Sequence, residues 1–155
     1  MFFIRKRKIA AFNADLERWK SLGRIIEANE ADFWFTSLGG VLEELPANVG
    51  DVLYVHTVDH GVACRVQLVY STTTRSLFIG DITSKPENKG FGSIAMKSVL
   101  YIAEKLDVNE VHGNLAVADK DHFDKLEHFY GKHGFDVMFD DSRTSGKISL
   151  KLNEN

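Results

Sequence analysis

The chain has 155 residues, 44% of them hydrophobic and 26% charged, and its formal net charge is −3. These values are typical of one globular domain with its own core. The slight acidic excess gives no support for a nucleic-acid-binding surface, and no apolar run reaches the ~20 residues that a membrane helix needs. Cys64 is the single cysteine, which excludes an internal disulfide, fits a reducing cytoplasm and predicts a buried, inert thiol.

The amino-terminal third carries the weakest pattern. Residues 1–11 are expected to form an edge strand, with the basic cluster 5–8 as its solvated edge. Asn13 or Asp15 is a candidate N-cap for a helix that runs to about Leu22. The side chains expected to face inward from this helix are Leu16 and Trp19.

The stretch after this helix is ambiguous. Residues 25–35 are rich in aromatic side chains and fit either a strand or a helix. Gly39-Gly40 is expected to break the regular structure. Residues 41–45 are expected to form a short helix before Pro46.

From residue 51 the pattern becomes that of a sheet. Residues 52–58 and 62–70 are rich in β-branched and aromatic side chains, and Asp59-His60-Gly61 between them predicts a tight hairpin. After a polar turn, residues 76–82 are apolar on both alternating faces, as in a strand buried inside a sheet. These three segments predict an antiparallel meander.

A loop, a helix and a parallel strand follow the meander. Residues 83–89 are polar, and Gly90-Phe91-Gly92 opens a helix expected over residues 91–106. The apolar stripe of this helix consists of Ala95, Val99, Ile102 and Leu106. A strand is expected over residues 111–117, which makes a crossover unit with parallel strands.

A second helix and a hairpin complete the predicted domain. Asp119 or Asp121 is a candidate N-cap for this helix, and Gly134 is its expected left-handed C-terminal cap. Residues 137–139 and 147–152 are expected to form the final hairpin. The apolar face of the second helix consists of Phe123, Leu126 and Tyr130. The whole chain is therefore expected to be an α/β domain with a mixed sheet.

The glycines at residues 90 and 92 have two interpretations. In the first, the backbone N–H groups at a helix start favour an anion, and glycine lets a phosphate approach closely. In the second, the glycines serve only a sharp turn. No Gly-Lys-Ser/Thr follows, which excludes a nucleoside-triphosphate P-loop. No acidic residue follows at the spacing of a dinucleotide fingerprint.

Two motifs resemble one known family. Residues 87–92, Glu-Asn-Lys-Gly-Phe-Gly, resemble the acetyl-coenzyme A loop of the GCN5-related N-acetyltransferases (GNAT), Arg/Gln-x-x-Gly-x-Gly/Ala. Residues 128–135 resemble the second signature, an aromatic-Tyr pair followed by Gly-Phe. The resemblance implies a mixed, mostly antiparallel sheet flanked by helices. It also implies a single domain over residues 1–155, with residues 1–50 on the substrate side and residues 51–152 as the cofactor-binding core.

The resemblance also implies the reaction and its residues. Acetyl-coenzyme A would be the co-substrate, and an amine would attack it directly in a ternary complex. Tyr130 would protonate the departing thiolate, although it also fits a core position. The pantetheine arm would be held by Ile82, Thr83 and Ser84, and the pyrophosphate by Asn88, Lys89, Gly90, Phe91, Gly92 and Ser93.

The chain departs from the family at two points. Glu87 stands where the family prefers Arg or Gln, so it is expected to point to solvent, and weaker cofactor binding is expected. Residues 118–122, Ala-Asp-Lys-Asp-His, lack the asparagine that relatives often use to contact the cofactor. The general base is not evident from the sequence: the candidates are Asp81, His56 and His112, each more often structural, and a water is the alternative.

Two functions from different classes follow. The first is an N-acetyltransferase whose acceptor is a small-molecule or peptide amine, with no nucleic-acid, membrane or metal partner and with homodimer formation left open. Residues 12–50 are expected to supply much of its acceptor pocket. The second is a non-catalytic module of the same fold that binds acyl-coenzyme A or protein partners, which Glu87 and the missing asparagine favour slightly.

Overall fold

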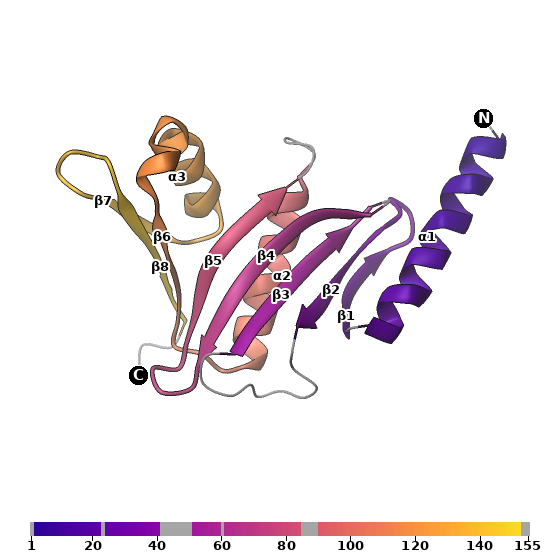
Figure 1. Ribbon diagram of the computed structural model, residues 1–155, viewed down its shortest axis with the longest axis horizontal. Helices are drawn as coiled ribbons and strands as arrows, with labels where there is room; N and C mark the ends of the chain where they lie inside the picture. Colours follow the sequence, from indigo (N-terminus) through magenta and orange to yellow (C-terminus); the bar gives the residue numbers. More distant parts are fainter. Residues whose placement is uncertain (1, 23, 41–50, 60, 85–89, 153–155) are drawn as a thin grey trace.

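The structure, a computed structural model, describes residues 2–22, 24–40, 51–59, 61–84 and 90–152 (Figure 1). Its helices are α1 Phe2–Leu22, α2 Phe91–Lys105 and α3 Phe123–Lys132, with a 3-10 turn at Val117–His122. Its strands are β1 Arg24–Asn29, β2 Trp34–Gly40, β3 Asp51–Val58, β4 Val62–Ser71, β5 Ser76–Ser84, β6 Glu110–Leu115, β7 Asp136–Phe139 and β8 Gly146–Lys151. None of the described helices is long and apolar enough to cross a membrane.

The described strands form one sheet in the order β1-β2-β3-β4-β5-β6-β8-β7. Every neighbouring pair is antiparallel except β5 and β6, which are parallel and are joined through α2. A parallel pair needs such a crossover, because a tight turn reverses the chain direction. The predicted meander, crossover unit and final hairpin are therefore confirmed.

The helices lie on opposite faces of the sheet. α2 lies behind β3, β4 and β5 in Figure 1, and its predicted apolar stripe is buried against them. α1 covers β1 and β2 on the other face, where Phe12 packs edge-on against Phe35 at 6.2 Å between ring centroids. The next residue of β2, Thr36, faces α2 instead, and its hydroxyl accepts a hydrogen bond from Ser98. Successive side chains of β2 point to opposite faces of the sheet, so this strand packs against α1 on one face and α2 on the other.

Three predictions for the amino-terminal third are wrong, and two of them concern α1. Residues 1–11 form no edge strand, because α1 starts at Phe2 and includes them. Neither Asn13 nor Asp15 is an N-cap, because both lie inside this helix. Arg, Lys and Ala are good helix formers. Residues 6–10, which include Lys6, Arg7 and Lys8, are exposed and precede the inward-facing Phe12, Leu16 and Trp19. The ambiguous residues 25–35 form β1 and the beginning of β2.

Gly39-Gly40 does not break the structure but belongs to β2, where its partners are Tyr54 and Leu53. The reason is a close contact: a Cβ at Gly39 would lie 3.2 Å from Cε1 of His56. The glycine therefore makes room for the imidazole ring. The helix predicted over residues 41–45 lies outside the described residues.

The predicted caps of α3 are half right. Neither Asp119 nor Asp121 is the N-cap, because the 3-10 turn runs directly into α3 and His122 holds that position without a side-chain hydrogen bond. Gly134 has φ +90°, as predicted for the residue that ends the helix. The 3-10 turn brings Asp119 to the site described next.

Candidate active site

The site begins at a β-bulge. Gln67 on β4 pairs with Asp81, while the next residue of β4 pairs with Ile79, so Gly80 is the extra residue of β5. A Cβ at Gly80 would lie 3.3 Å from Oε1 of Gln67, which favours glycine here. A bulge bends its strand, and the pairing of β5 with β6 stops at Ile79 and Gly113. The two parallel strands separate beyond this point.

A cavity of about 570 Å³ occupies the place where the strands separate. Its walls are the ends of β5 and β6, the start of α2, the 3-10 turn and α3. Ile82 and Leu115 line it from the side of the sheet that carries α2, and Asp81 and Asn114 line it as well. Because Asp81 pairs with Gln67 on the face away from α2, the cavity reaches both faces of the sheet.

The start of α2 forms one wall. Gly90 has φ +79° at the N-cap and its carbonyl accepts the first helical hydrogen bond from Ile94, 3.1 Å away. The backbone N–H groups of residues 91–93 precede this bond and have no partner within the helix. No acidic residue lies in the first turn. This end of the helix therefore attracts an anion.

Tyr130 forms the opposite wall. Its side chain is 6% exposed and packs between the rings of Phe129 and Phe135, whose centroids lie 5.2 and 5.6 Å away. Burial, with the carboxylates of Asp119 and Asp81, raises the pKa of Tyr130 to about 12. The phenol is therefore neutral at physiological pH and carries a proton that it can donate into the cavity.

The predicted cofactor residues are only partly gathered here. Residues that line the cavity are Ile82, Ser84, Gly90, Gly92 and Ser93, together with Tyr130. Thr83 is exposed and does not line it, and the Phe91 side chain is buried in the core. Glu87, Asn88 and Lys89 lie outside the described residues.

The three candidate bases are far from equivalent. Asp81 lines the cavity. His56 lies on β3, 4.8 Å from the ring of Trp19, and burial followed by the charge of Arg65 lowers its pKa. His112 packs edge-on against Phe78 at 5.3 Å and lines a different cavity. Asp81 is therefore the one candidate of the three that lies at the site.

A polar face of α3 and the turn before it, which was not predicted, also lines the cavity. His122, Lys125 and Lys132 line the cavity with Phe129. Their spacing of three to four residues places them on one side of the helix, next to the predicted apolar stripe. This periodicity was available in the sequence, but only the apolar residues were read as a stripe.

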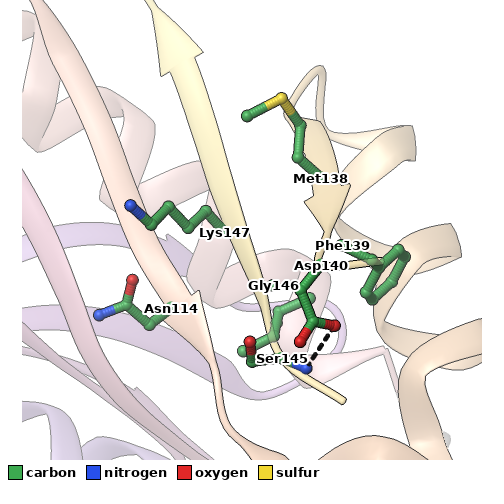
Figure 2. Close-up of a pocket in the computed structure, with 8 residues that line it drawn as sticks. Asn114, Met138, Phe139, Asp140, Ser145, Gly146 and Lys147 are labelled. Carbon is green, nitrogen blue, oxygen red and sulfur yellow. Dashed lines mark hydrogen bonds between the residues drawn. The ribbon is translucent and has the colours of Figure 1, made fainter. Parts of the chain in front are cut away.

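A second cavity, of about 360 Å³, adjoins the first at Asn114 and lies against the β7–β8 hairpin (Figure 2). Lys147 and the 66% exposed Met138 lie along it. Asp140 turns its carboxylate toward the hairpin loop, where the Ser145 N–H donates to it at 3.2 Å. Such hydrogen bonds hold the pKa of Asp140 at about 2. Asp140 therefore orders the loop.

Comparisons with known proteins give a relative and a fold. The uncharacterized protein YocC of Bacillus subtilis (strain 168) is 36% identical over 111 residues, which cover 62% of this chain and 67% of YocC. The chain belongs to the YocC family. No protein-family model matches it.

Solved structures show which known fold the chain has. The N-acetyltransferase PseH of Campylobacter jejuni matches with a TM-score of 0.51 and 24% identity, over 66% of this chain and 69% of PseH. A GNAT-family acetyltransferase of Staphylococcus aureus matches with a TM-score of 0.54 and 10% identity, over 67% of this chain and 70% of that one. The chain has the GNAT fold, which confirms the fold predicted from the two motifs.

Proposed function

We propose that the chain is an N-acetyltransferase that transfers the acetyl group of acetyl-coenzyme A to a primary amine. The observation that carries the proposal is one cavity, between separated parallel strands, that joins a helix N-terminus to the buried phenol of Tyr130. The same fold holds acetyl-coenzyme A in the structure of PseH.

The residues present fit such a ligand. We assign the pyrophosphate to the backbone N–H groups of residues 88–93, of which the described residues 90–93 form the start of α2. Lys125 and Lys132 add positive charge at the cavity. We assign the pantetheine arm to Ile82, Thr83 and Ser84. Beyond Ile79, β5 no longer pairs with β6, so its backbone groups on that side are available to the amides of the arm.

The chemistry needs few protein groups. Acetyl-coenzyme A supplies a thioester, and the amine nitrogen forms a bond to its carbonyl carbon as the carbon–sulfur bond breaks. Tyr130 gives its proton to the departing sulfur and regains one from solvent. Asp81, or a water beside it, takes the proton that the amine loses. The main contribution of the cavity is to hold the amine against the carbonyl.

Thermal unfolding tests cofactor binding. Acetyl-coenzyme A at a hundred times its dissociation constant adds ~2.7 kcal/mol to the free energy of unfolding, so we expect the melting temperature to rise by about 5–10 °C. Gly92→Leu should reduce this rise, because a Cβ at residue 92 already lies 3.4 Å from the Phe129 ring and a longer side chain would enter the cavity.

Gly131→Leu is the matched control. A Cβ at Gly131 has no neighbour within 4 Å, and Gly131 does not line the cavity. This variant should keep the full rise. If millimolar acetyl-coenzyme A leaves the melting temperature of the unaltered protein unchanged, the proposed function is wrong.

The affinity for coenzyme A should also increase as the pH falls. Nε2 of His133 lies 3.3 Å from Oγ of Ser93 at the start of α2. Burial, with the charges of Lys132 and Lys97, lowers the pKa of His133. The negative charge of a bound pyrophosphate would raise the pKa of His133 again, so that binding is accompanied by the uptake of a proton. The affinity should therefore increase as the pH falls from about 7 to about 5. Calorimetric titration across this range measures the effect.

His133→Gln separates this contribution from the titration of the ligand's own phosphates. The variant should show a smaller change of affinity with pH than the unaltered protein. An identical change in both proteins would show that His133 does not sense the bound phosphates.

A further inference from the structure

The face of the sheet opposite α2 carries a row of polar and aromatic side chains beside the cavity. β3, β4 and β5 turn this face toward the viewer in Figure 1, and no described helix covers it there. Tyr54 on β3 pairs with Gln67 on β4, which pairs with Asp81 on β5. His56 and Arg65 form the next pair along the same face. The row therefore runs from α1 to the mouth of the cavity.

Arg65 is the notable member of this row. Its guanidinium lies 5.2 Å from the ring centroid of Tyr54, in a cation–π contact. The side chain of Arg65 is exposed, and it makes no ion pair with any residue that the structure describes. The Tyr54 ring fixes the guanidinium and leaves its N–H donors available.

The neighbours of Arg65 do not supply an anion. His56 is held in its neutral form at physiological pH, because burial and Arg65 lower its pKa. The ring of His56 stacks on that of Tyr54, with 6.0 Å between the ring centroids, and it also contacts the ring of Trp19. Asp81 is the nearest carboxylate along the row. It lies at the cavity on β5, where it accepts a hydrogen bond at 3.5 Å from Thr83, the strand partner of Arg65, and it forms no ion pair with Arg65. The face thus presents a cation and, separately, an anion.

The distance between these charges follows from strand spacing. Neighbouring strands lie about 4.8 Å apart, so the guanidinium over Tyr54 is between one and two spacings, about 5–10 Å, from β5. An acceptor that reaches from Asp81 to Arg65 would therefore carry its amine and its carboxylate at the two ends of a short carbon chain.

We propose that Arg65 selects the acceptor: the open face binds an amine that also carries a carboxylate, with the ammonium group at Asp81 and the carboxylate on the guanidinium of Arg65. This inference rests on the proposed function and names its substrate class. Arg65 would make a charge-assisted, bidentate contact to the carboxylate, and Tyr54 would be the positioning residue beneath it. The cofactor would enter from the α2 side, so the two substrates would meet where the cavity crosses the sheet.

A pair of acceptors that differ only in charge tests the proposal. The probes are 5-aminopentanoate and 5-aminopentanamide, each titrated calorimetrically into protein saturated with coenzyme A and each assayed for acetyl transfer. We expect the acid to bind, and to have a lower KM than the amide, by about 10- to 100-fold, the usual worth of a charged hydrogen bond. Arg65→Gln should remove this preference through KM, with little change in kcat.

Lys105→Gln is the matched control. Lys105 also lies over an exposed tyrosine, with Nζ 5.3 Å from the ring centroid of Tyr101, but on α2, and neither residue lines the cavity. This variant should keep the preference for the acid. Tyr54→Phe should keep it as well, because a phenyl ring still supports the guanidinium, whereas Tyr54→Leu should weaken it several-fold.

The outcomes separate the two proposals. Equal binding of acid and amide, binding of neither, or a preference that survives Arg65→Gln would overturn the role of Arg65, even if acetyl-coenzyme A stabilises the protein. A protein that acetyl-coenzyme A does not stabilise would instead refute the proposed function.

Discussion

Tyr130→Phe is expected to lower kcat about 100-fold and to leave the affinity for acetyl-coenzyme A unchanged. The ring would stay packed against Phe129 and Phe135, so only the proton donor is lost. Because burial raises the pKa of Tyr130 to about 12, the phenol should remain protonated up to that pH. The rate should therefore show no alkaline loss from this group below about pH 11.

Tyr70→Phe is the control for this prediction. Tyr70 is also a buried tyrosine, 5% exposed, but it lies on β4 in the core and does not line the cavity. Steady-state kinetics should show near-normal turnover for this variant. If Tyr130→Phe changes the melting temperature but not the turnover, the phenol is a core residue rather than an acid. If no amine is acetylated although the cofactor binds, the non-catalytic module becomes the better interpretation.

Most helices and strands among the described residues from 51 to 152 could be predicted, because their structure is determined locally. The apolar stripe of α2 and the alternating strands before it are complete within short windows of sequence. The left-handed conformation of Gly134 likewise needs no distant partner. In these segments the local pattern and the final fold agree, so the periodicity alone identified the elements.

The amino-terminal third was mispredicted because its structure depends on distant contacts. In the sequence, Gly39 looks like a break in regular structure. In the fold it belongs to β2, where the His56 ring on the neighbouring strand leaves little room for a side chain at residue 39. α1 is held by Phe35 and Val58, which follow it in the chain. Neither contact is visible in a local window, and the apolar residues at the start of α1 fit a strand equally well.

The candidate site shows the same division. The glycine loop and Tyr130 carry a local motif, and the structure brings both to one cavity. The bulge at Gly80 depends on the register between two strands, and the contact of Arg65 with Tyr54 depends on pairing across two others. Such features appear only once the strands are aligned. On the open face of β3, β4 and β5, only the candidate bases His56 and Asp81 were therefore predicted, and the acceptor pocket was expected from residues 12–50 instead.

Phe35→Ala is expected to lower the free energy of unfolding by about 3–5 kcal/mol. Phe35 is 0% exposed, and its ring meets those of Phe12 at 6.2 Å and Trp19 at 6.4 Å. These contacts join α1 to the sheet, in a small cluster that also contains Val58. The substitution therefore removes apolar contacts and leaves a cavity between α1 and the sheet. Neither the helix nor the strand can move enough to fill this cavity. Chemical denaturation measures the loss.

Tyr101→Ala, which removes a 47% exposed aromatic ring from α2, is the control and should change the free energy of unfolding by less than about 1 kcal/mol. A loss of that small size for Phe35→Ala would mean that α1 does not pack on β2.

The result also bears on the open face of β3, β4 and β5, because Trp19 of α1 packs on His56. If α1 loosens, His56 and the Tyr54 ring beside it should be less well fixed. Phe35→Ala should then weaken the preference for the acid through KM while the stabilisation by acetyl-coenzyme A persists, since no described residue of α1, β1 or β2 lines the cavity.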